Sequence, residues 1–507
     1  MNSSFALFVD SQINLSMMKN NLNIQAQSSE QTDSSLSVTY KKTIHAGIVV
    51  NESEITTKET VKPVSKQRSS KKKARAFYQQ LIPVNIYNEL TAIEGEIRPY
   101  IIGYKTVNLL QIISIVAWHI REDEGIARLQ MKSLKGQVPS GDLYMKELIS
   151  NQIVIRTGQP IKGVKCYEYS FATDWQSKCV KIPLNDMYLI RRLENQQIKI
   201  SKERKNSFRG HSKQVISLKL LSIDAGFDQY MEKEFEGNFN QENNIIASAT
   251  RITNHDYTCR RDGTSKRLHT NITNMAKDLR GFLRVKGKPL VNIDIKNSQP
   301  YLSSILLTHP DQVARFAKDD QLAKLLKEIK IPKSPDIAHY IELVTSGKIY
   351  EFLMAEFSKE GLILTRNETK EQVLRILYAK NWMPKNPENR LARIIFKVNF
   401  PQVHRFFSKI RGHGKDGKNW NINNKFVTYR RFAILLQRIE SHLVLDVIMK
   451  RVYKEWPNVF AMTIHDSILT VNDRGVVDSI FKIMVEELEK FVGFPPILKE
   501  EGFFEGN

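Results

Sequence analysis

The chain of 507 residues is poor in sulfur ligands, since it has only three cysteines, Cys166, Cys179 and Cys259. The count is odd, no Cys-x-x-Cys pair occurs, and no histidines cluster at ligand spacing, which excludes a disulfide framework and a zinc-finger-type site. Cysteines used in this way are typical of a reducing compartment. The sequence therefore predicts a cytoplasmic protein without structural zinc.

Long apolar runs and targeting segments are also lacking. The longest apolar tract runs from Leu109 to Ile120, whereas a helix that crosses a bilayer needs about 20 apolar residues. The first residues, Met1 to Val9, have too short an apolar run and no basic flank for a secretory signal. We expect no membrane span.

Positive charge is the main compositional feature of the chain. Lys and Arg number 76 against 54 Asp and Glu, which gives a formal net charge of +22. Because the charge is spread along much of the chain, it predicts an extended polyanionic partner, with nucleic acid as the leading candidate; the alternative is a surface of solvated lysines. With 41% apolar residues, the chain is expected to bury a core and to divide into a few domains.

Two regions are set apart by composition. Residues 1–75 are rich in Ser, Thr, Gln and Lys and close with the basic run Lys66 to Arg75, so they predict a mostly disordered basic tail, either a linker or a nucleic-acid arm. Residues 179–245 form a basic, mainly helical stretch. This stretch would suit the thumb of a nucleic-acid enzyme, and otherwise it is a solvated helical face.

Residues 76–178 predict helices followed by a hairpin. Apolar spacing over 107–116 indicates one helix, and 140–149 a second with a polar start. Alternation around Ile153 and again around Tyr169 indicates two strands joined by a basic loop. The region resembles a winged-helix DNA-binding module, in which Lys162 and Lys165 of the loop would contact backbone phosphate. A helix-plus-hairpin packing domain is the alternative.

Two aspartates stand in apolar runs where strands are expected. Asp294 ends the run from Pro289, and Asp466 lies within the run from Phe460 to Thr470. Carboxylates on rigid strands that share a cleft would hold a pair of divalent metal ions for phosphoryl transfer. Each aspartate alone could instead cap a turn. Both together, on either side of a basic helix, favour the metal site.

The basic helix lies between the two aspartates in the sequence. Arg366 and Lys370 are one helical turn apart, so they share a face that could bind the phosphates of a nucleotide. A solvated basic face is the alternative for such a pair. Tyr378, two turns further on, follows Leu377 near the apolar side and is either a core residue or a residue of the site.

These segments, in this order, resemble family A DNA polymerases and the related single-subunit phage-type RNA polymerases over about residues 245–507. Asp294 is followed by Ile295-Lys-Asn-Ser-Gln299, which is similar to the first metal-binding motif, and His465-Asp466-Ser467 is similar to the second. The fingers helix of the family has the spacing Arg366-x3-Lys370-x3-Leu374-x3-Tyr378. Further similar segments are Ser265–Thr270, Lys277–Arg280, Phe400–Phe406 and Arg431–Gln437 with Glu440.

The resemblance implies an α+β, helix-rich fold in which residues 246–507 form a palm with an antiparallel sheet and helical fingers. It implies a nucleotidyltransferase, and foremost a DNA-directed DNA polymerase that acts in replication on primer-template DNA. Two Mg²⁺ ions, with Mn²⁺ as an alternative, would be held by Asp294 and Asp466, and Lys370 would act in catalysis. The nucleotide would contact Arg366, Lys370, Leu374, Tyr378 and Gln299, and the nucleic acid would contact Arg267, Arg280, Gln437 and His465.

Several positions depart from the family pattern and leave alternatives open. Leu374 replaces an aromatic that stacks on the nucleotide, and Ala379 replaces a glycine, which favours a DNA-binding replication initiator with a catalytically silent core. Ser467 resembles the RNA polymerase form, and Gln299 replaces a glutamate that excludes ribose, which favours an RNA polymerase or primase. No acidic set for a proofreading exonuclease precedes residue 240, and the short polymerase-like part suggests dependence on a partner protein.

Overall fold

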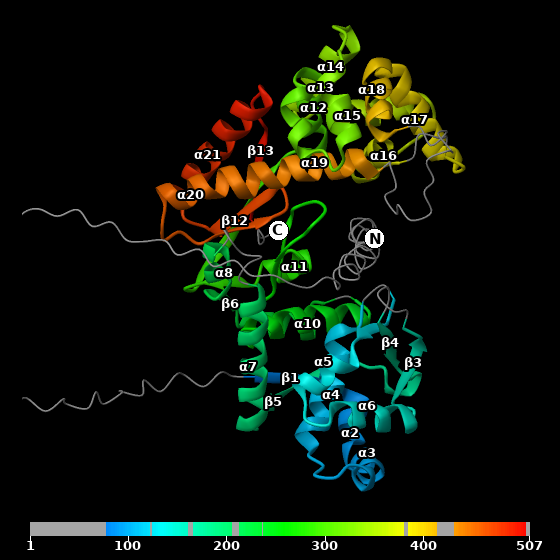
Figure 1. Ribbon diagram of the computed structural model, residues 1–507, viewed down its shortest axis with the longest axis vertical. Helices are drawn as coiled ribbons and strands as arrows, with labels where there is room; N and C mark the ends of the chain where they lie inside the picture. The colour runs from blue at the N-terminus through cyan, green and yellow to red at the C-terminus, as the bar shows by residue number, and fades with distance from the viewer. Residues whose placement is uncertain are drawn as a thin grey trace, which may run out of the picture. The chain divides into compact units, whose positions relative to one another are not determined.

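The computed structural model describes residues 78–121, 124–160, 166–204, 212–235, 237–379, 384–412 and 430–502. The predicted tail 1–75 and the loop lysines Lys162 and Lys165 lie outside these ranges. Helices make up most of the described chain (Figure 1), and every strand pair in it is antiparallel, which confirms a mixed, helix-rich fold with antiparallel sheets.

The first part of the described chain contains the predicted helices and hairpin. Along the chain, the elements α4, β2, α5, α6, β3 and β4 follow one another. The three strands pair in a sheet of order β2-β4-β3. A separate two-stranded ribbon pairs β1 with β5. The elements are β1 (Tyr78–Pro83), α2 (Val84–Asn88), α3 (Leu90–Ile97), η1 (Arg98–Tyr100), α4 (Thr106–His119), β2 (Ala127–Leu129), α5 (Met131–Gln137), α6 (Gly141–Ser150), β3 (Val154–Gly158), β4 (Tyr167–Phe171), η2 (Thr173–Trp175) and β5 (Cys179–Leu184).

The stretch predicted as thumb-like is mainly helical. It contains α7 (Met187–Arg204), α8 (Ser212–Leu218), β6 (Leu221–Ile223), α9 (Gly226–Lys233) and α10 (Phe239–Thr253). Its last helix is anchored to the ribbon, because Asn254, just after α10, accepts a hydrogen bond from the backbone of Gln79 at 2.8 Å and returns one at 3.0 Å. The predicted boundary between residues 178 and 179 falls just before β5. Because β5 pairs with β1, this strand belongs to the same ribbon as the first element of the preceding region.

The remaining elements build a second, larger sheet with many helices. The strands run in the order β11-β12-β10-β9-β6, with β13 also paired to β10. The elements are β7 (Cys259–Arg261), β8 (Leu268–Thr270), α11 (Lys277–Arg280), β9 (Leu283–Val285), β10 (Lys288–Ile295), α12 (Ser298–Thr308), η4 (Pro310–Phe316), α13 (Asp320–Glu328), α14 (Pro335–Thr345), α15 (Ile349–Lys359), α16 (Arg366–Tyr378), α17 (Pro387–Asn399), α18 (Pro401–Arg411), α19 (Arg431–Ser441), the π-helical η6 (His442–Ile448), α20 (Met449–Glu455), β11 (Ala461–Ile464), β12 (Ser467–Val471), α21 (Arg474–Val492) and β13 (Leu498–Gly502).

The larger sheet is buried on both faces. Val291, Ile293 and Ile468 belong to one apolar core, which the helices from α12 to α21 supply, whereas Leu290 and Leu469 belong to a second core. Side chains on a strand alternate between the two faces, so the near-continuous apolar run of β10 is what a strand covered on both sides requires. Asp294 is four residues from Leu290 and therefore projects to the same face.

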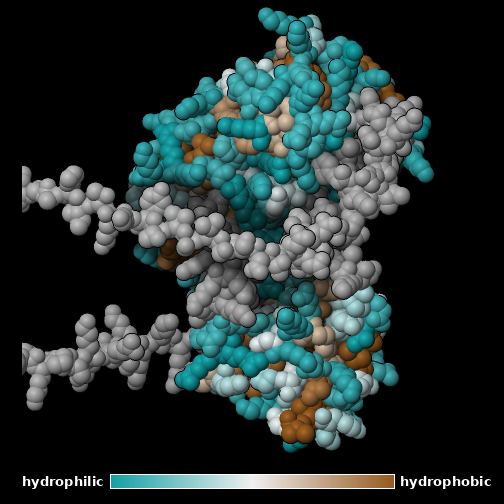
Figure 2. Space-filling model, viewed as in Figure 1, coloured by the Kyte–Doolittle hydropathy of each residue, from teal (hydrophilic) through white to brown (hydrophobic). Residues whose placement is uncertain are grey.

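The surface fits a protein that carries many charges. The face in Figure 2 is mainly hydrophilic, and its apolar residues lie in scattered patches. Such scattered exposure is normal for a folded protein. Within the described ranges, no helix combines the length and the apolar character that a membrane crossing requires.

The thiols should differ in reactivity. Cys179 is buried, and burial raises the pKa of its thiol to about 12, whereas Cys166 is half-buried. Because the thiolate is the nucleophile, we expect iodoacetamide at pH 8 to alkylate Cys166 first and to leave Cys179 unmodified until the protein unfolds. Peptide mass spectrometry after timed alkylation measures this, and equal rates at the two thiols would contradict the burial of Cys179.

Candidate active site

The sheet brings the two predicted metal-binding aspartates to one end of neighbouring strands. Asp294 is the penultimate residue of β10 and stands opposite Ser467 of β12. Asp466 was predicted within a strand, and this was wrong: the apolar run from Phe460 to Thr470 is two strands, β11 and β12, joined by a turn at His465 and Asp466. His465 has a positive φ of 56°, which a two-residue hairpin turn requires.

Negative charge accumulates around Asp294. Burial raises the pKa of its carboxyl above the ordinary value, and the charges of Asp466, Glu501 and Glu440 raise it further, while the ammonium of Lys370 opposes them. Glu501 lies on β13, which pairs with β10 on its other side. Glu501 was not selected from the sequence, because a glutamate near the end of a short, mixed-charge strand carries no distinguishing pattern.

Asp466 and His465 differ in their hydrogen bonding. The hydroxyl of Ser298, at the start of α12, donates a hydrogen bond to Asp466 Oδ2. Nδ1 of His465 is buried without a hydrogen-bond partner among the described residues, and the ring stands 5.9 Å from that of His269. Burial, followed by the positive charge of Arg267, holds the pKa of His465 well below its ordinary value, so the imidazole is neutral.

The predicted basic helix is α16, and it contains all four residues of the predicted spacing. Thr365 caps its first turn and forms a reciprocal capping box with Glu368, which fixes where the helix begins. Val373, Ile376 and Leu377 are residues of this helix whose side chains are buried. Of the four predicted residues on this helix, Arg366 and Lys370 are exposed, and Leu374 and Tyr378 are half-buried.

The two cations of α16 differ in their surroundings. Arg366 donates to Glu351 at 2.7 Å, and its guanidinium lies 5.4 Å from the centre of the Tyr350 ring. The charge of Lys370 acts on Asp294 and Glu501, since it lowers the pKa of both carboxyls. Lys370 is therefore the cation of α16 whose charge acts on Asp294 and Glu501.

A buried network connects four predicted elements through Glu440, whose side chain is fully buried on α19. Arg267 makes a bidentate ion pair with its carboxylate at 2.8 and 2.9 Å, and the Gln299 amide donates to it as well. The hydroxyl of Tyr378 donates to Gln299 Oε1 at 2.7 Å. Glu440 was noted in the sequence only as part of a similar helix; a glutamate between Ile439 and Ser441 on an apolar helix is the signal that could have marked it, because a buried charge needs partners.

The other predicted nucleic-acid contacts lie in different environments. Arg280, at the end of α11, donates to the Met275 carbonyl at 3.1 Å, and its charge acts on His465. Gln437 is buried on α19, and its Oε1 has no hydrogen-bond partner within the described part of the chain. Lys162 and Lys165 remain outside the described residues, so their predicted contact with phosphate stays a prediction.

The donor set fits a hard divalent cation that shares its ligands with a substrate. Among the described residues, no group of three or more His, Cys, Asp or Glu side chains is arranged to hold a metal ion. Mg²⁺ in phosphoryl-transfer sites is held by one or two carboxylates together with water and substrate phosphates. Asp294 and Asp466 could supply two such carboxylates, and a bound cation would relieve the repulsion by which Asp466 raises the pKa of Asp294.

No protein-family model matches the chain, and no curated protein sequence matches it. Among solved structures, the POL domain of Pol1 from M. smegmatis, in complex with DNA primer-template and dNTP, is similar at a TM-score of 0.29 and 9% sequence identity. The match covers 83% of this chain and 66% of the POL-domain chain. This chain therefore spans slightly less than two thirds of the length of the POL-domain chain. Activity, substrates and partners are therefore inferred from the residues of this chain itself.

Proposed function

We propose that this protein is a template-directed nucleic-acid polymerase that adds nucleotides by two-metal phosphoryl transfer. The observation that carries the proposal is the meeting of Asp294 and Asp466 at one end of adjacent strands, with the charge of Lys370 of α16 acting on Asp294. Phosphoryl transfer needs carboxylates for divalent cations and a cation for the triphosphate, and it needs little else from the protein. The likeness of these motifs to family A polymerases supports the same assignment.

Each residue of the site has a defined part in this proposal. Asp294 and Asp466 hold two Mg²⁺ ions, which when bound stabilise the charge on the attacking and leaving oxygens. Lys370 and Arg366 bind the triphosphate, and Leu374 and Tyr378 line the side of α16 where the nucleotide lies. Arg267, Arg280, Gln437 and His465 face template or primer. Gln437 and His465 are suited to this part because each has a buried polar atom that a nucleic-acid group would satisfy.

The N-terminal elements are proposed to form a winged-helix-like module that binds DNA. Their order, α4-β2-α5-α6-β3-β4, with β3 and β4 as the hairpin, supports this reading. Replication on DNA, in the cytoplasm and with partner proteins, belongs to the same proposal and rests on sequence likeness and net charge.

Lys370 should contribute more to activity than Arg366. Its charge already acts on Asp294, whereas Arg366 is engaged by Glu351. A charge-assisted contact is worth about 1.5–3 kcal/mol, so Lys370→Ala is expected to lower kcat/KM for nucleotide addition by about 100-fold, and Arg366→Ala by less. Steady-state incorporation measures this. Lys359→Ala, which changes an exposed lysine of α15, is the matched control and should leave kcat/KM unchanged.

The test of the proposal is primer extension with Mg²⁺ on a labelled primer-template, with dNTPs and rNTPs supplied separately. Addition with dNTPs supports a DNA polymerase. Addition with rNTPs alone would favour an RNA polymerase or primase, which the neutral Gln299 and Ser467 permit. Tight, salt-sensitive DNA binding with no addition of either nucleotide would favour the silent initiator, for which Leu374 and Ala379 are the specific observations.

A further inference from the structure

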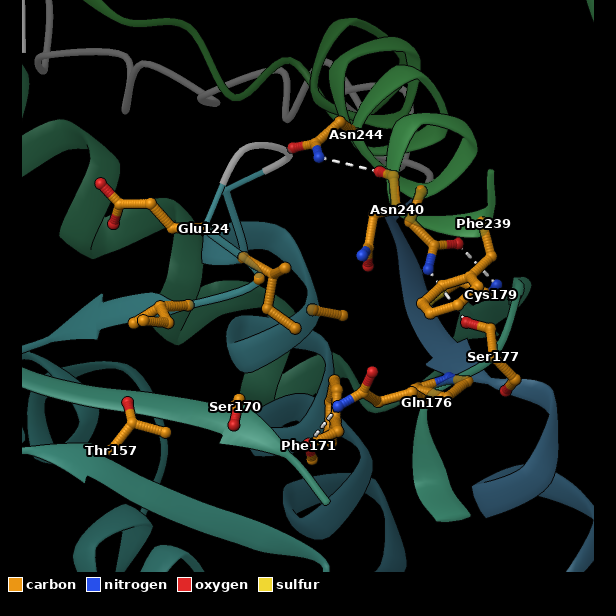
Figure 3. A pocket seen from close by; sticks show the side chains of 16 residues that line it. Glu124, Thr157, Ser170, Phe171, Gln176, Ser177, Cys179, Phe239, Asn240 and Asn244 are labelled. Carbon is orange, nitrogen blue, oxygen red and sulfur yellow. Dashed lines mark hydrogen bonds between the residues drawn. The ribbon is translucent and has the colours of Figure 1, made fainter. Parts of the chain in front are cut away.

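A cavity of about 340 Å³ lies far along the chain from the aspartates, among the N-terminal elements. It is bounded by the end of α4, the strands β4 and β5, and the start of α10 (Figure 3). None of its lining residues has a part in the proposed polymerase site. Its volume falls within the range of cavities that take a small ligand or one chemical group of a larger one.

The lining is apolar at its base. Ala117 and Phe171 are buried, and Ile120 is half-buried beside them. Phe239, the first residue of α10, is 36% exposed and adds an aromatic ring to the wall. An aromatic ring that is left partly exposed beside a cavity can stack on a flat partner.

Amide side chains supply the polar part of the wall. Asn243 is fixed, because it accepts from the Cys179 backbone at 2.7 Å and donates to the Ser177 carbonyl at 2.9 Å. The side chain of Asn240 makes no hydrogen bond to the described residues, and Asn244 uses only its amino group, toward the Asn240 carbonyl at 2.8 Å. Donor and acceptor capacity on Asn240, and acceptor capacity on Asn244, therefore remain for a ligand.

The described residues that line the cavity carry no uncompensated charge. Glu124 is the one carboxylate among its lining residues, and it is ion-paired with Arg128 at 2.6 Å and with Arg121 at 3.6 Å. The thiol of Cys179 is protonated at neutral pH because burial raises its pKa to about 12. A phosphate or carboxylate would gain no cation from the lining, so a neutral, flat, hydrogen-bonding group fits better.

We propose that this cavity takes one unstacked nucleobase, with adenine as the best fit. Phe239 would stack on the ring, as aromatic side chains do when they bind single-stranded bases. Asn240 and Asn244 would pair with the base edge, since an asparagine amide matches the adjacent donor and acceptor of adenine. The phosphates would stay outside the neutral cavity. This inference is independent of Asp294 and Asp466, so loss of polymerase activity would leave it intact.

The test measures binding of a strand in which one base is available. An eight-nucleotide, fluorescein-labelled abasic strand with a single central adenine is compared with the fully abasic strand by fluorescence anisotropy, on the full-length protein. Wild type should bind the adenine strand about tenfold more tightly, which is the scale of one stacked base. Free adenosine, titrated by calorimetry, forms a second arm that distinguishes a nucleoside from a base within a strand.

Matched variants connect the result to the cavity. Phe239→Ala and Asn240→Ala should each abolish the preference for adenine, and both leave the Asn238–Gln241 capping box of α10 intact. Asn88→Ala, at an exposed asparagine of α2, should leave it unchanged. Adenine-dependent binding in either arm that disappears in the two cavity variants supports the proposal. Equal binding of the two strands together with no adenosine binding, or a preference that survives both substitutions, overturns it.

Discussion

Asp294→Asn and Asp466→Asn are each expected to lower the rate of nucleotide addition by about a thousandfold or more, which corresponds to about 4 kcal/mol of lost transition-state stabilisation. The reason is that each substitution removes a charge from the only pair of carboxylates assigned to the metal ions, at a site where these charges already repel each other. Single-turnover primer extension with Mg²⁺ measures the rate.

DNA binding should survive both substitutions, because phosphate contacts would come from the cations spread over the chain and not from these acids. Asp473→Asn is the matched control, since Asp473 follows β12 closely, is 46% exposed and, within the described ranges, forms an ion pair only with Lys288, at 3.4 Å. It should extend primers at the wild-type rate. Normal extension by both Asp294→Asn and Asp466→Asn would show that the site is wrongly assigned.

Glu440→Ala should cause a large loss of stability. Its carboxylate is fully buried and holds Arg267 in two hydrogen bonds and Gln299 in a third. Removing one partner of a buried ion pair leaves an uncompensated charge and costs about 3–5 kcal/mol. The urea midpoint, followed by circular dichroism, should fall accordingly.

A second ion pair in the same region provides the comparison. Arg261 and Asp446 are also joined by two hydrogen bonds, at 2.8 and 2.7 Å, but both side chains are 23% exposed. Water can solvate the arginine that remains, so Asp446→Ala should cost only about 1 kcal/mol. Similar, small losses for the two variants would mean that Glu440 is not the centre of a buried network.

The helix α16 illustrates what the sequence could predict. Thr365 and Glu368 mark its start through a local capping box, and its apolar face recurs with helical period, so its limits and the shared face of Arg366 and Lys370 follow from nearest neighbours in the chain. The β3–β4 hairpin was predictable for the same reason, because alternation and a basic loop are local signals.

The turn at Asp466 and the role of Glu440 were not predictable in this way. Both β11 and β12 are apolar and covered on two faces, so the alternation that would reveal a turn is absent, and His465 and Asp466 are not the glycine-rich pair that usually marks one. The partners of Glu440 lie 173 and 141 residues away in the sequence. Only the tertiary fold brings these groups together.

The most direct test of the central claim is single-nucleotide addition opposite each of the four template bases, by the wild-type protein and by Asp466→Asn, with Mg²⁺ present. The account predicts that the wild-type protein adds only the complementary nucleotide opposite each base and that Asp466→Asn adds none on the same timescale. Addition that ignores the template base, or equal addition by the two proteins, would contradict a template-directed polymerase that works through Asp466.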